Sequence, residues 1–338
     1  MSKNIMISGA SGKQVSFVPA LKMQAEQLKS AARQGYYYPM LALKQLASLS
    51  SGFNGKHNVF IPNVNDSRAH TLQVVLVYVP GIRATVEQRP NNTYVVTQLE
   101  LSDGYTQIGK GMAKPGIYKA EKVGAGKYKA DYKSNDRITP EDGRLVVICD
   151  GSYDNPREAA EDAHSCLQEV AGVYAMRSEF DIVYTGLNQE LGKRGYDPSS
   201  INESKAIASI TANAMIHAEK KTGVLWVSMF GGSAVLSQAM HIVARQKVKL
   251  EKHIVKMYHP QTNPSPVMRL AQQIGITMDK EFVKAGGKRA VRTYCNALLG
   301  SRARAKNEAD PYSWKDYDKA LATGAMSGVG ALGAGLFI

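Results

Sequence analysis

The residues with the clearest chemical potential lie in one short turn of this 338-residue chain. An apolar run over 224–228 predicts a buried strand, and Phe230-Gly231-Gly232-Ser233-Ala234 leads from it into a predicted helix over 233–246. A serine on a sharp turn between a strand and a helix can act as a nucleophile when a base activates it. Serine is also a preferred N-cap residue, so the position of Ser233 suits either role.

A serine nucleophile needs partner groups, and the sequence places two candidates at one sheet edge. The histidines that follow the turn are His241, His253 and His259. His259 follows the predicted strand 253–258, and open α/β sheets bind ligands beside the carboxyl ends of their strands. Asp150 follows the predicted strand 145–149 at the same edge. We therefore expect His259 as the base and Asp150 as a site carboxylate, whereas Asp181 falls inside a strand and suits a structural role.

Alternating strands and helices between about 144 and 260 predict the scaffold that positions these residues. Such alternation with short links is typical of a doubly wound, mostly parallel sheet. The predicted strands cover 145–149, 180–184, 224–228 and 253–258, and the predicted helices cover 156–170, about 200–221 and 233–246. A hairpin precedes them, because two alternating segments flank Gly124-Ala125-Gly126, where glycine supplies the positive φ of a turn.

The two ends of the chain differ from this α/β region. The first 14 residues have the composition of a flexible segment. The residues that follow predict helices over 19–33 and 39–48 and strands over 71–79 and 93–101. After about residue 260 the pattern is helical and basic, over 266–274, 279–285 and 288–299.

A Gly/Ala-rich tail over 320–338 carries no charged residue. It suits packing on the sheet or docking at a membrane interface, and its length also suits a transmembrane span. We expect three parts: an N-terminal helical segment over 1–68, an α/β domain over 69–300, and a polar break with the apolar tail over 301–338.

The charge distribution favours an anionic partner. The net charge is +13, and residues 217–306 hold sixteen Lys/Arg and four Asp/Glu, which gives 16 − 4 = +12. Such a region is either a solvated face or a surface for acidic lipid or another anionic partner. Nucleic acid is not indicated, because no aromatic residues are interleaved with the basic ones. The sequence is silent on oligomeric state.

The sequence indicates no metal site and no cofactor. Cys149, Cys166 and Cys295 are widely spaced and form no CxxC pair, which argues against zinc and against a disulfide framework. The loop Gly9-Ala10-Ser11-Gly12-Lys13-Gln14 departs from a phosphate-binding loop, because Gln14 stands where Ser or Thr is needed. No signal-peptide pattern is present, so we expect a cytoplasmic protein or one exported without a cleaved signal, with possible peripheral membrane association.

The order and spacing of these elements resemble the α/β-hydrolase superfamily over about 117–258. The hairpin is similar to the family's first two strands, and Asp150-Gly151 stands where the family often has His-Gly beside the oxyanion hole. The family's elbow pattern is Gly-x-Ser-x-Gly. Here Ser228-Met229-Phe230-Gly231-Gly232 fits that spacing only with Phe230 in the nucleophile position. Ser233 fits if the strand is longer, and Ser228 is the remaining hydroxyl.

The resemblance implies two alternative functions. In the family the nucleophile is followed by an acid and then by a histidine after a later strand. No histidine follows His259 in this chain. This favours a catalytically degenerate hydrolase fold that binds an anionic partner or a membrane surface. The alternative is an esterase- or lipase-type serine hydrolase with Ser233, His259 and Asp150, which suits a bacterial secreted effector acting on lipid.

Overall fold

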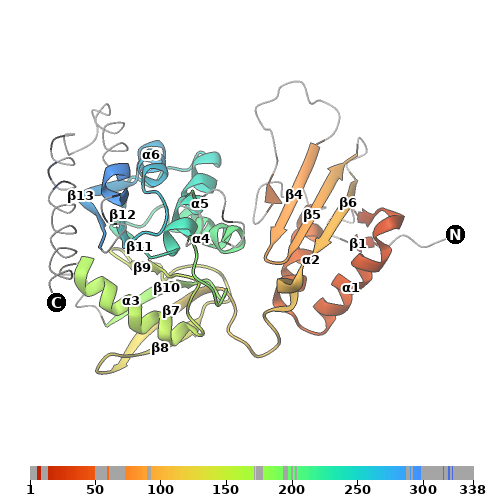
Figure 1. Cartoon of the computed structure of the whole chain (residues 1–338), viewed down its shortest axis with the longest axis horizontal. Helices are drawn as coiled ribbons and strands as arrows, with labels where there is room; N and C mark the ends of the chain where they lie inside the picture. Colours follow the sequence, from red (N-terminus) through yellow and green to blue (C-terminus); the bar gives the residue numbers. More distant parts are fainter. Residues whose placement is uncertain are drawn as a thin grey trace, which may run out of the picture. The chain divides into compact units, whose positions relative to one another are not determined.

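The chain divides into two compact units, an N-terminal unit (Met1–Lys114) and a C-terminal unit (Pro115–Ile338) (Figure 1). The structure is a computed structural model. It describes residues 6–8, 14–49, 59–60, 73–89, 93–170, 172, 178–192, 197–198, 201, 204–286, 290, 292–297, 315, 319 and 322. The predicted boundary after residue 68 differs from this division. The strands over 71–79 and 93–101 belong to the sheet of the N-terminal unit, where a strand over 82–88 that we did not predict joins them.

The N-terminal unit is a six-stranded sheet with helices packed against it. Its strand order is β1-β2-β6-β5-β4-β3. The strands are β1 (Met6–Ser8), β2 (Gln14–Phe17), β3 (Val59–Phe60), β4 (Gln73–Val79), β5 (Ile82–Gln88) and β6 (Tyr94–Leu101). The helices are η1 (Pro19–Leu21), α1 (Lys22–Arg33) and α2 (Tyr37–Leu49), and η2 (Asp103–Thr106) follows the last strand. The prediction of a flexible start was wrong at β1, which pairs with β2.

Alternation along β5 and β6 explains why the helices cover one face of this sheet. Ile82, Ala84 and Val86 are buried, and the residues between them point to the other face. The buried set packs with Leu28 of α1 and with residues of α2 in one hydrophobic cluster. The opposite face carries polar pairs such as the hydrogen bond between Thr85 and Gln98, so the unit is a two-layer α/β structure.

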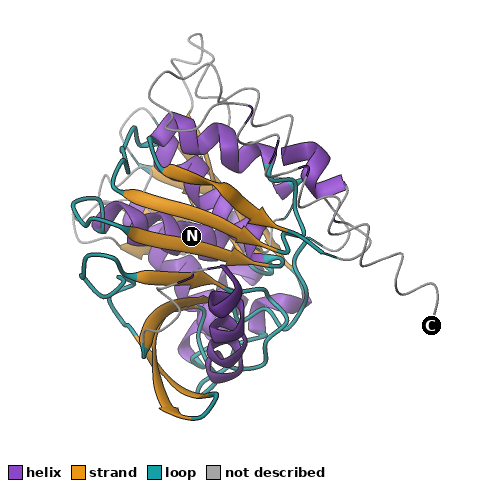
Figure 2. Cartoon of the chain, turned by 90° about the vertical axis from the view of Figure 1, so that its left-hand side faces the viewer, coloured by secondary structure: helices purple, strands orange, loops and turns teal. Residues whose placement is uncertain are grey.

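The C-terminal unit contains the predicted mostly parallel sheet, with helices on both faces (Figure 2). Its strand order is β13-β12-β11-β9-β10-β7-β8. The strands are β7 (Gly116–Gly124), β8 (Lys127–Tyr132), β9 (Leu145–Ile148), β10 (Glu179–Tyr184), β11 (Val224–Met229), β12 (His253–Tyr258) and β13 (Thr277–Lys284). Strands β9 to β13 pair in parallel, whereas the hairpin β7–β8 is antiparallel and joins the sheet beside β10.

Four helices of the C-terminal unit cover the two faces of this sheet. They are α3 (Pro156–Val170), α4 (Lys205–His217), α5 (Gly232–Arg245) and α6 (Ser265–Ile274). Trp226 and Met257 pack with α4, α5 and α6 in one core. Cys149 and Lys256 reach α3 on the other face. Because both faces are covered, the central strands β9 and β11 are buried along their whole length, which is why they read as continuous apolar runs.

One predicted helix is a strand. Residues 279–285 were predicted to be helical, but β13 pairs in parallel with β12 at the sheet edge. Met278 lies opposite Val255 and Val283 lies opposite Met257, so the pairing is irregular between these positions. The irregularity breaks the strict alternation that signals a strand, and the buried residues Met278 and Phe282 then show a helix-like spacing of four.

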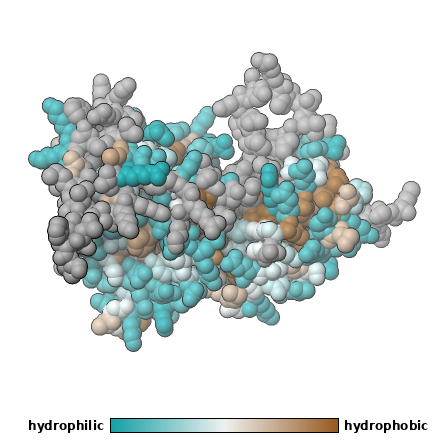
Figure 3. Space-filling model, in the orientation of Figure 1, coloured by the Kyte–Doolittle hydropathy of each residue, from teal (hydrophilic) through white to brown (hydrophobic). Residues whose placement is uncertain are grey.

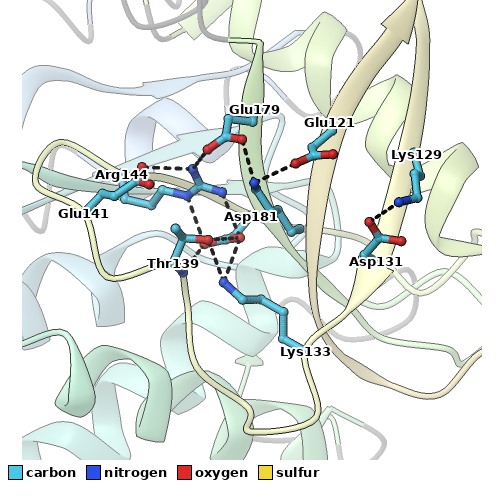
Figure 4. Close-up of polar contacts among 10 residues, drawn as sticks. Glu121, Lys129, Asp131, Lys133, Thr139, Glu141, Arg144, Glu179 and Asp181 are labelled. Atoms are coloured by element: carbon cyan, nitrogen blue, oxygen red, sulfur yellow. Dashed lines mark hydrogen bonds and ion pairs between the residues drawn. The ribbon is translucent and has the colours of Figure 1, made fainter.

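A buried ion pair ties β9 to β10 at their amino ends (Figure 4). Arg144 donates from Nε to Asp181 Oδ2 and from Nη2 to Oδ1, each at 3.0 Å, and both side chains are almost fully buried. Thr139 and Lys133 also contact the Asp181 carboxylate, and Glu179 accepts from Arg144. Asp181 therefore has the structural role that its place inside a strand indicated.

The C-terminal predictions are tested only in part. Residues 290 and 292–297 are helical, as the pattern over 288–299 predicted. The polar break at 307–310 and the apolar tail, apart from residue 322, lie outside the described residues. Among the described residues, no helix is long and apolar enough to cross a membrane.

Candidate functional site

The topology of the C-terminal unit places a switch point between the carboxyl ends of β9 and β11. After β9 the chain passes through α3 to β10, whereas after β11 it passes through α5 to β12 on the other side of β9. Ligands of open α/β sheets bind at such a switch point, outside the carboxyl ends of the strands. Asp150 follows β9 and His259 follows β12, so these two residues lie at the same edge of the sheet.

The turn after β11 is strained at Phe230. Its φ of +49° lies in the left-handed region, which bulky residues rarely adopt. The main chain of Phe230 is fixed on both sides, because its N–H donates to Tyr258 O and its carbonyl accepts from Gln261 N. In a strand–elbow–helix turn this is the residue presented at the tip, and phenylalanine has no nucleophilic atom.

The two glycines after Phe230 allow a close approach of backbones. A Cβ at Gly231 would overlap the Asp150 carboxylate, and a Cβ at Gly232 would overlap the carbonyl oxygen of Ile148. The sharp turn predicted from the sequence is therefore present, and its glycines are required by packing against the end of β9.

Ser233 is buried behind this turn rather than presented at its tip. Its side chain is fully buried, and its Oγ accepts hydrogen bonds from Thr262 Oγ1 at 2.7 Å and from Thr262 N at 3.2 Å. The hydroxyl thus joins the start of α5 to the loop between β12 and α6. The N-cap of α5 is Gly231, so the interpretation of Ser233 as the helix cap was wrong.

Asp150 binds mainly backbone groups, and the Ser152 hydroxyl is a longer contact, with its Oγ 3.5 Å from Asp150 Oδ2. Its Oδ1 accepts from Gly151 N at 2.7 Å and from Leu191 N at 3.0 Å, and the carboxylate lies against Gly231 at the start of α5. Burial raises the pKa of Asp150, and the two backbone N–H groups partly oppose that shift. The carboxylate therefore lies beside the amino end of α5, where the helix dipole favours a negative charge.

His259 lies among aromatic and charged side chains at the next strand end. The backbone of His259 is also in the left-handed region, with φ of +44°, and its main-chain N–H donates to Lys284 O. Its ring lies 4.4 Å from the Tyr258 ring and 6.1 Å from the Phe230 ring, measured between centroids. Burial lowers the pKa of His259, while the charge of Glu169 raises it and that of Lys284 lowers it further.

Sequence reasoning missed the polar cluster beside His259. Tyr258 donates its hydroxyl hydrogen to Glu169 Oε1 at 2.9 Å, and Lys284 Nζ lies 2.5 Å from Glu169 Oε2. Tyr258 and Glu169 are separated by 89 positions in the sequence, so no local spacing links them. The contact forms because α3 packs against β12.

The three predicted residues share an edge but not an interaction. Within the part of the chain that the structure describes, no hydrogen bond joins any two of Ser233, His259 and Asp150. His253 is buried beneath Trp226, whose Nε1 donates to His253 Nδ1 at 3.2 Å.

The remaining serine candidate and the three cysteines do not form a site among the described residues. Ser228 is fully buried, and its hydroxyl has no hydrogen-bond partner among the described residues. The described residues contain no cluster of three His, Cys, Asp or Glu side chains that could hold a metal ion. Cys149 and Cys166 are buried free thiols, whereas Cys295 is exposed rather than buried.

Comparisons with known proteins add little to this geometry. No protein-family model matches the chain, and no curated protein matches it. Oligopeptidase B from Trypanosoma brucei with covalently bound antipain has a TM-score of 0.23 and 9% identity, with 65% of this chain and 31% of that one covered. A candidate dipeptidyl aminopeptidase IV from Bacteroides ovatus has a TM-score of 0.27 and 10% identity, with 80% and 42% covered. The chain thus spans less than half of either protein, and these scores carry no argument about its activity.

Proposed function

We propose that the C-terminal unit is a catalytically degenerate α/β-hydrolase-like domain that acts by binding an anionic partner. The observation that carries this proposal is the strained turn after β11. Its left-handed position, where a hydrolase would present its nucleophile, holds Phe230. A phenyl ring cannot form an acyl intermediate, so the costly backbone conformation is retained without the chemistry that it usually serves.

Two further contacts support the absence of catalysis. Ser233 is fully buried and its hydroxyl is bound by Thr262, so neither an ester nor an imidazole reaches it in this arrangement. Asp150 occupies the amino end of α5 with its own carboxylate. A negative charge at that place opposes the development of an oxyanion.

The charge of the chain supports an anionic partner. The net charge is +13, and the excess is concentrated in residues 217–306. A surface of this sign attracts polyanions and acidic membranes over a distance comparable with the Debye length. The proposal therefore has two parts, absence of ester hydrolysis and salt-sensitive binding of anions, which are tested separately.

Turnover of short-chain p-nitrophenyl esters and of phospholipids tests the first part. We expect the wild type and Ser233→Ala to show equal background rates. Ser237→Ala is the matched control, because Ser237 is also buried on α5, one turn further along. Turnover that Ser233→Ala abolishes and Ser237→Ala retains would establish the alternative, an esterase- or lipase-type serine hydrolase with His259 near its site.

Binding of inorganic polyphosphate across a salt series tests the second part. We expect binding by the full chain that weakens steadily as the salt concentration rises, because exposed charges are screened. Absence of binding at low salt would contradict an anionic partner. A salt-independent affinity would contradict the electrostatic origin of binding.

A further inference from the structure

The amino ends of β11 and β12 carry a surface that is separate from the candidate site. Two loops form it: 218–223, which joins α4 to β11, and 245–252, which ends α5 and leads to β12. The loops are neighbours because Val224 pairs with His253 at the start of the two strands, and because Gly223 N donates to Lys252 O at 2.7 Å. We call the residues of these two loops the amino-edge surface.

This amino-edge surface is strongly basic. Its cations are Lys220, Lys221, Arg245, Lys247, Lys249 and Lys252, and its carboxylates are Glu219 and Glu251. The balance is 6 − 2 = +4 over two short loops. All six cations are exposed except Lys221, which is partly buried. Among the described residues, none of the six forms an ion pair with a carboxylate.

One carboxylate from outside these loops borders the surface. Asp142 accepts a hydrogen bond from Thr222 N at 2.8 Å and so lies beside the 218–223 loop, whereas Glu141 pairs with the buried Arg144. Lys249 donates to the carbonyl oxygen of Gln273 and forms no ion pair within the described part of the chain. By contrast, several lysines at the other end of the sheet are paired, for example Lys129 with Asp131 (Figure 4).

A structural explanation accounts for only some of these charges. Basic residues near the carboxyl end of a helix stabilise its dipole, and Arg245 in the last turn of α5 suits that role. Lys249 suits the same role at α6, because its acceptor Gln273 lies in the last turn of that helix. Lys252 lies well beyond the last turn of α5, where the effect of the dipole has fallen off. Exposed charges of one sign in neighbouring loops repel each other, and this repulsion is relieved when an anionic surface neutralises them.

We propose that the amino-edge surface docks the protein onto acidic lipid headgroups. This inference rests on the proposed function and names the partner for its binding part. The two loops contain no aromatic residue, so they provide no platform for nucleic-acid bases. Five of the six cations are lysines, which interact as point charges and suit the diffuse field of an anionic bilayer.

The amino-edge surface lies at the opposite edge of the sheet from the candidate site. Phe230 and His259 lie at the carboxyl ends of β11 and β12, whereas the amino-edge surface lies at their amino ends. Much of the described surface of the C-terminal unit is hydrophilic in the view of Figure 3, which accords with attachment by charge rather than by insertion. Docking therefore orients the strained turns away from the membrane.

Vesicle co-sedimentation of the full chain tests the proposal. The vesicles contain phosphatidylcholine with phosphatidylserine, and pure phosphatidylcholine vesicles serve as the uncharged control. The test variant combines Lys220→Gln, Lys247→Gln and Lys252→Gln. The matched control combines Lys122→Gln, Lys127→Gln and Lys129→Gln, three exposed lysines of the β7–β8 hairpin. Both variants lower the net charge by three, from +13 to 13 − 3 = +10, so their net charges match. The control set also removes the surface ion pair of Lys129 with Asp131.

We expect the wild type to bind the acidic vesicles and not the uncharged ones. Each lysine near an anionic surface contributes about fivefold in partitioning, so the test variant should bind about 100-fold more weakly. The hairpin variant should lose less than about tenfold, through the long-range field alone. Unchanged far-ultraviolet circular dichroism and tryptophan fluorescence establish that both variants are folded.

Three other results would overturn parts of the proposal. Equal losses in the two variants, or no loss in the test variant, would overturn the assignment of this surface. Absence of vesicle binding together with salt-sensitive polyphosphate binding would overturn the lipid partner and leave the proposed function standing. Absence of both would overturn the binding part of the proposed function as well.

Discussion

Replacement of Asp150 separates a structural carboxylate from a catalytic one. Asp150 Oδ1 accepts from the buried main-chain N–H groups of Gly151 and Leu191. Asp150→Ala removes the acceptor and leaves both donors without a partner, at a cost of about 1–3 kcal/mol for each. We therefore expect Asp150→Ala to lower the free energy of unfolding of the C-terminal unit by roughly 2–6 kcal/mol.

Asp150→Asn is the matched control, because an amide oxygen can replace Oδ1 as the acceptor. Burial raises the pKa of Asp150 above its ordinary 3.8, which means that the buried charge itself lowers stability. The amide carries no such charge, so we expect Asp150→Asn to stay within about 1 kcal/mol of the wild type at neutral pH.

The same shift predicts a pH dependence with a definite sign. A carboxyl whose folded-state pKa is raised stabilises the fold below its unfolded value, and that contribution is lost as the pH rises through the folded-state pKa. The wild type should therefore lose stability relative to Asp150→Asn as the pH rises from below 3.8 through the raised pKa. Parallel pH profiles for the two proteins would contradict a buried, charged Asp150.

Urea unfolding followed by tryptophan fluorescence measures these differences. Both tryptophans, Trp226 and Trp314, belong to the C-terminal unit, so the signal reports that unit alone. The reasoning is refuted if Asp150→Ala is as stable as the wild type. A loss of ester turnover in Asp150→Ala without a loss of stability would show instead that the carboxylate is catalytic.

Three further predictions concern the core of the C-terminal unit, and the same unfolding assay measures them. Ser233→Ala should lower the free energy of unfolding by about 1–3 kcal/mol, because Thr262 N and Thr262 Oγ1 lose their shared acceptor. An unchanged free energy of unfolding would contradict this contact. Asp181→Ala should cost about 3–5 kcal/mol, because it leaves the buried Arg144 guanidinium without its main partner, and a cost below about 1 kcal/mol would contradict a buried ion pair. Burial lowers the pKa of His253 from 6.5, so the neutral imidazole stabilises the fold fully above pH 6.5. That contribution should be lost as the pH falls from 6.5 through the lowered pKa. A stability difference between the wild type and His253→Gln that does not change with pH would contradict this.

The parallel strands and their helices were predictable because burial on both faces leaves a plain pattern. Strand β12 and helix α3 have the bounds that the sequence indicated, and β11 is one residue longer. The hairpin β7–β8 followed from its alternation and its glycine turn. A local pattern was enough to predict these elements, because the spacing of apolar residues along the sequence follows the period of the strand or helix that contains them.

The division of the chain was not predictable in the same way. Strands β4 and β6 read correctly as strands, but their pattern does not state which sheet they join. Pairing through β5 places them in the N-terminal unit. The strand β13 was mistaken for a helix because its irregular pairing with β12 hides the alternation.

The candidate site was located by the sequence but not described by it. Spacing placed Phe230, Ser233 and Asp150 at one edge of the sheet, because parallel strands end together. Spacing does not determine hydrogen-bond partners. The contact of Ser233 with Thr262 and that of Tyr258 with Glu169 depend on loops packed from distant parts of the chain.

Reaction with a fluorophosphonate probe tests the central claim most directly, because this reagent forms a covalent adduct with an activated serine hydroxyl. Intact-mass measurement of the full chain reads the adduct without the need for a known substrate. A buried Ser233 bound by Thr262, with Phe230 at the tip of the turn, predicts no adduct on the folded wild type. An adduct that maps to Ser233, and that is absent from Ser233→Ala, would contradict the account.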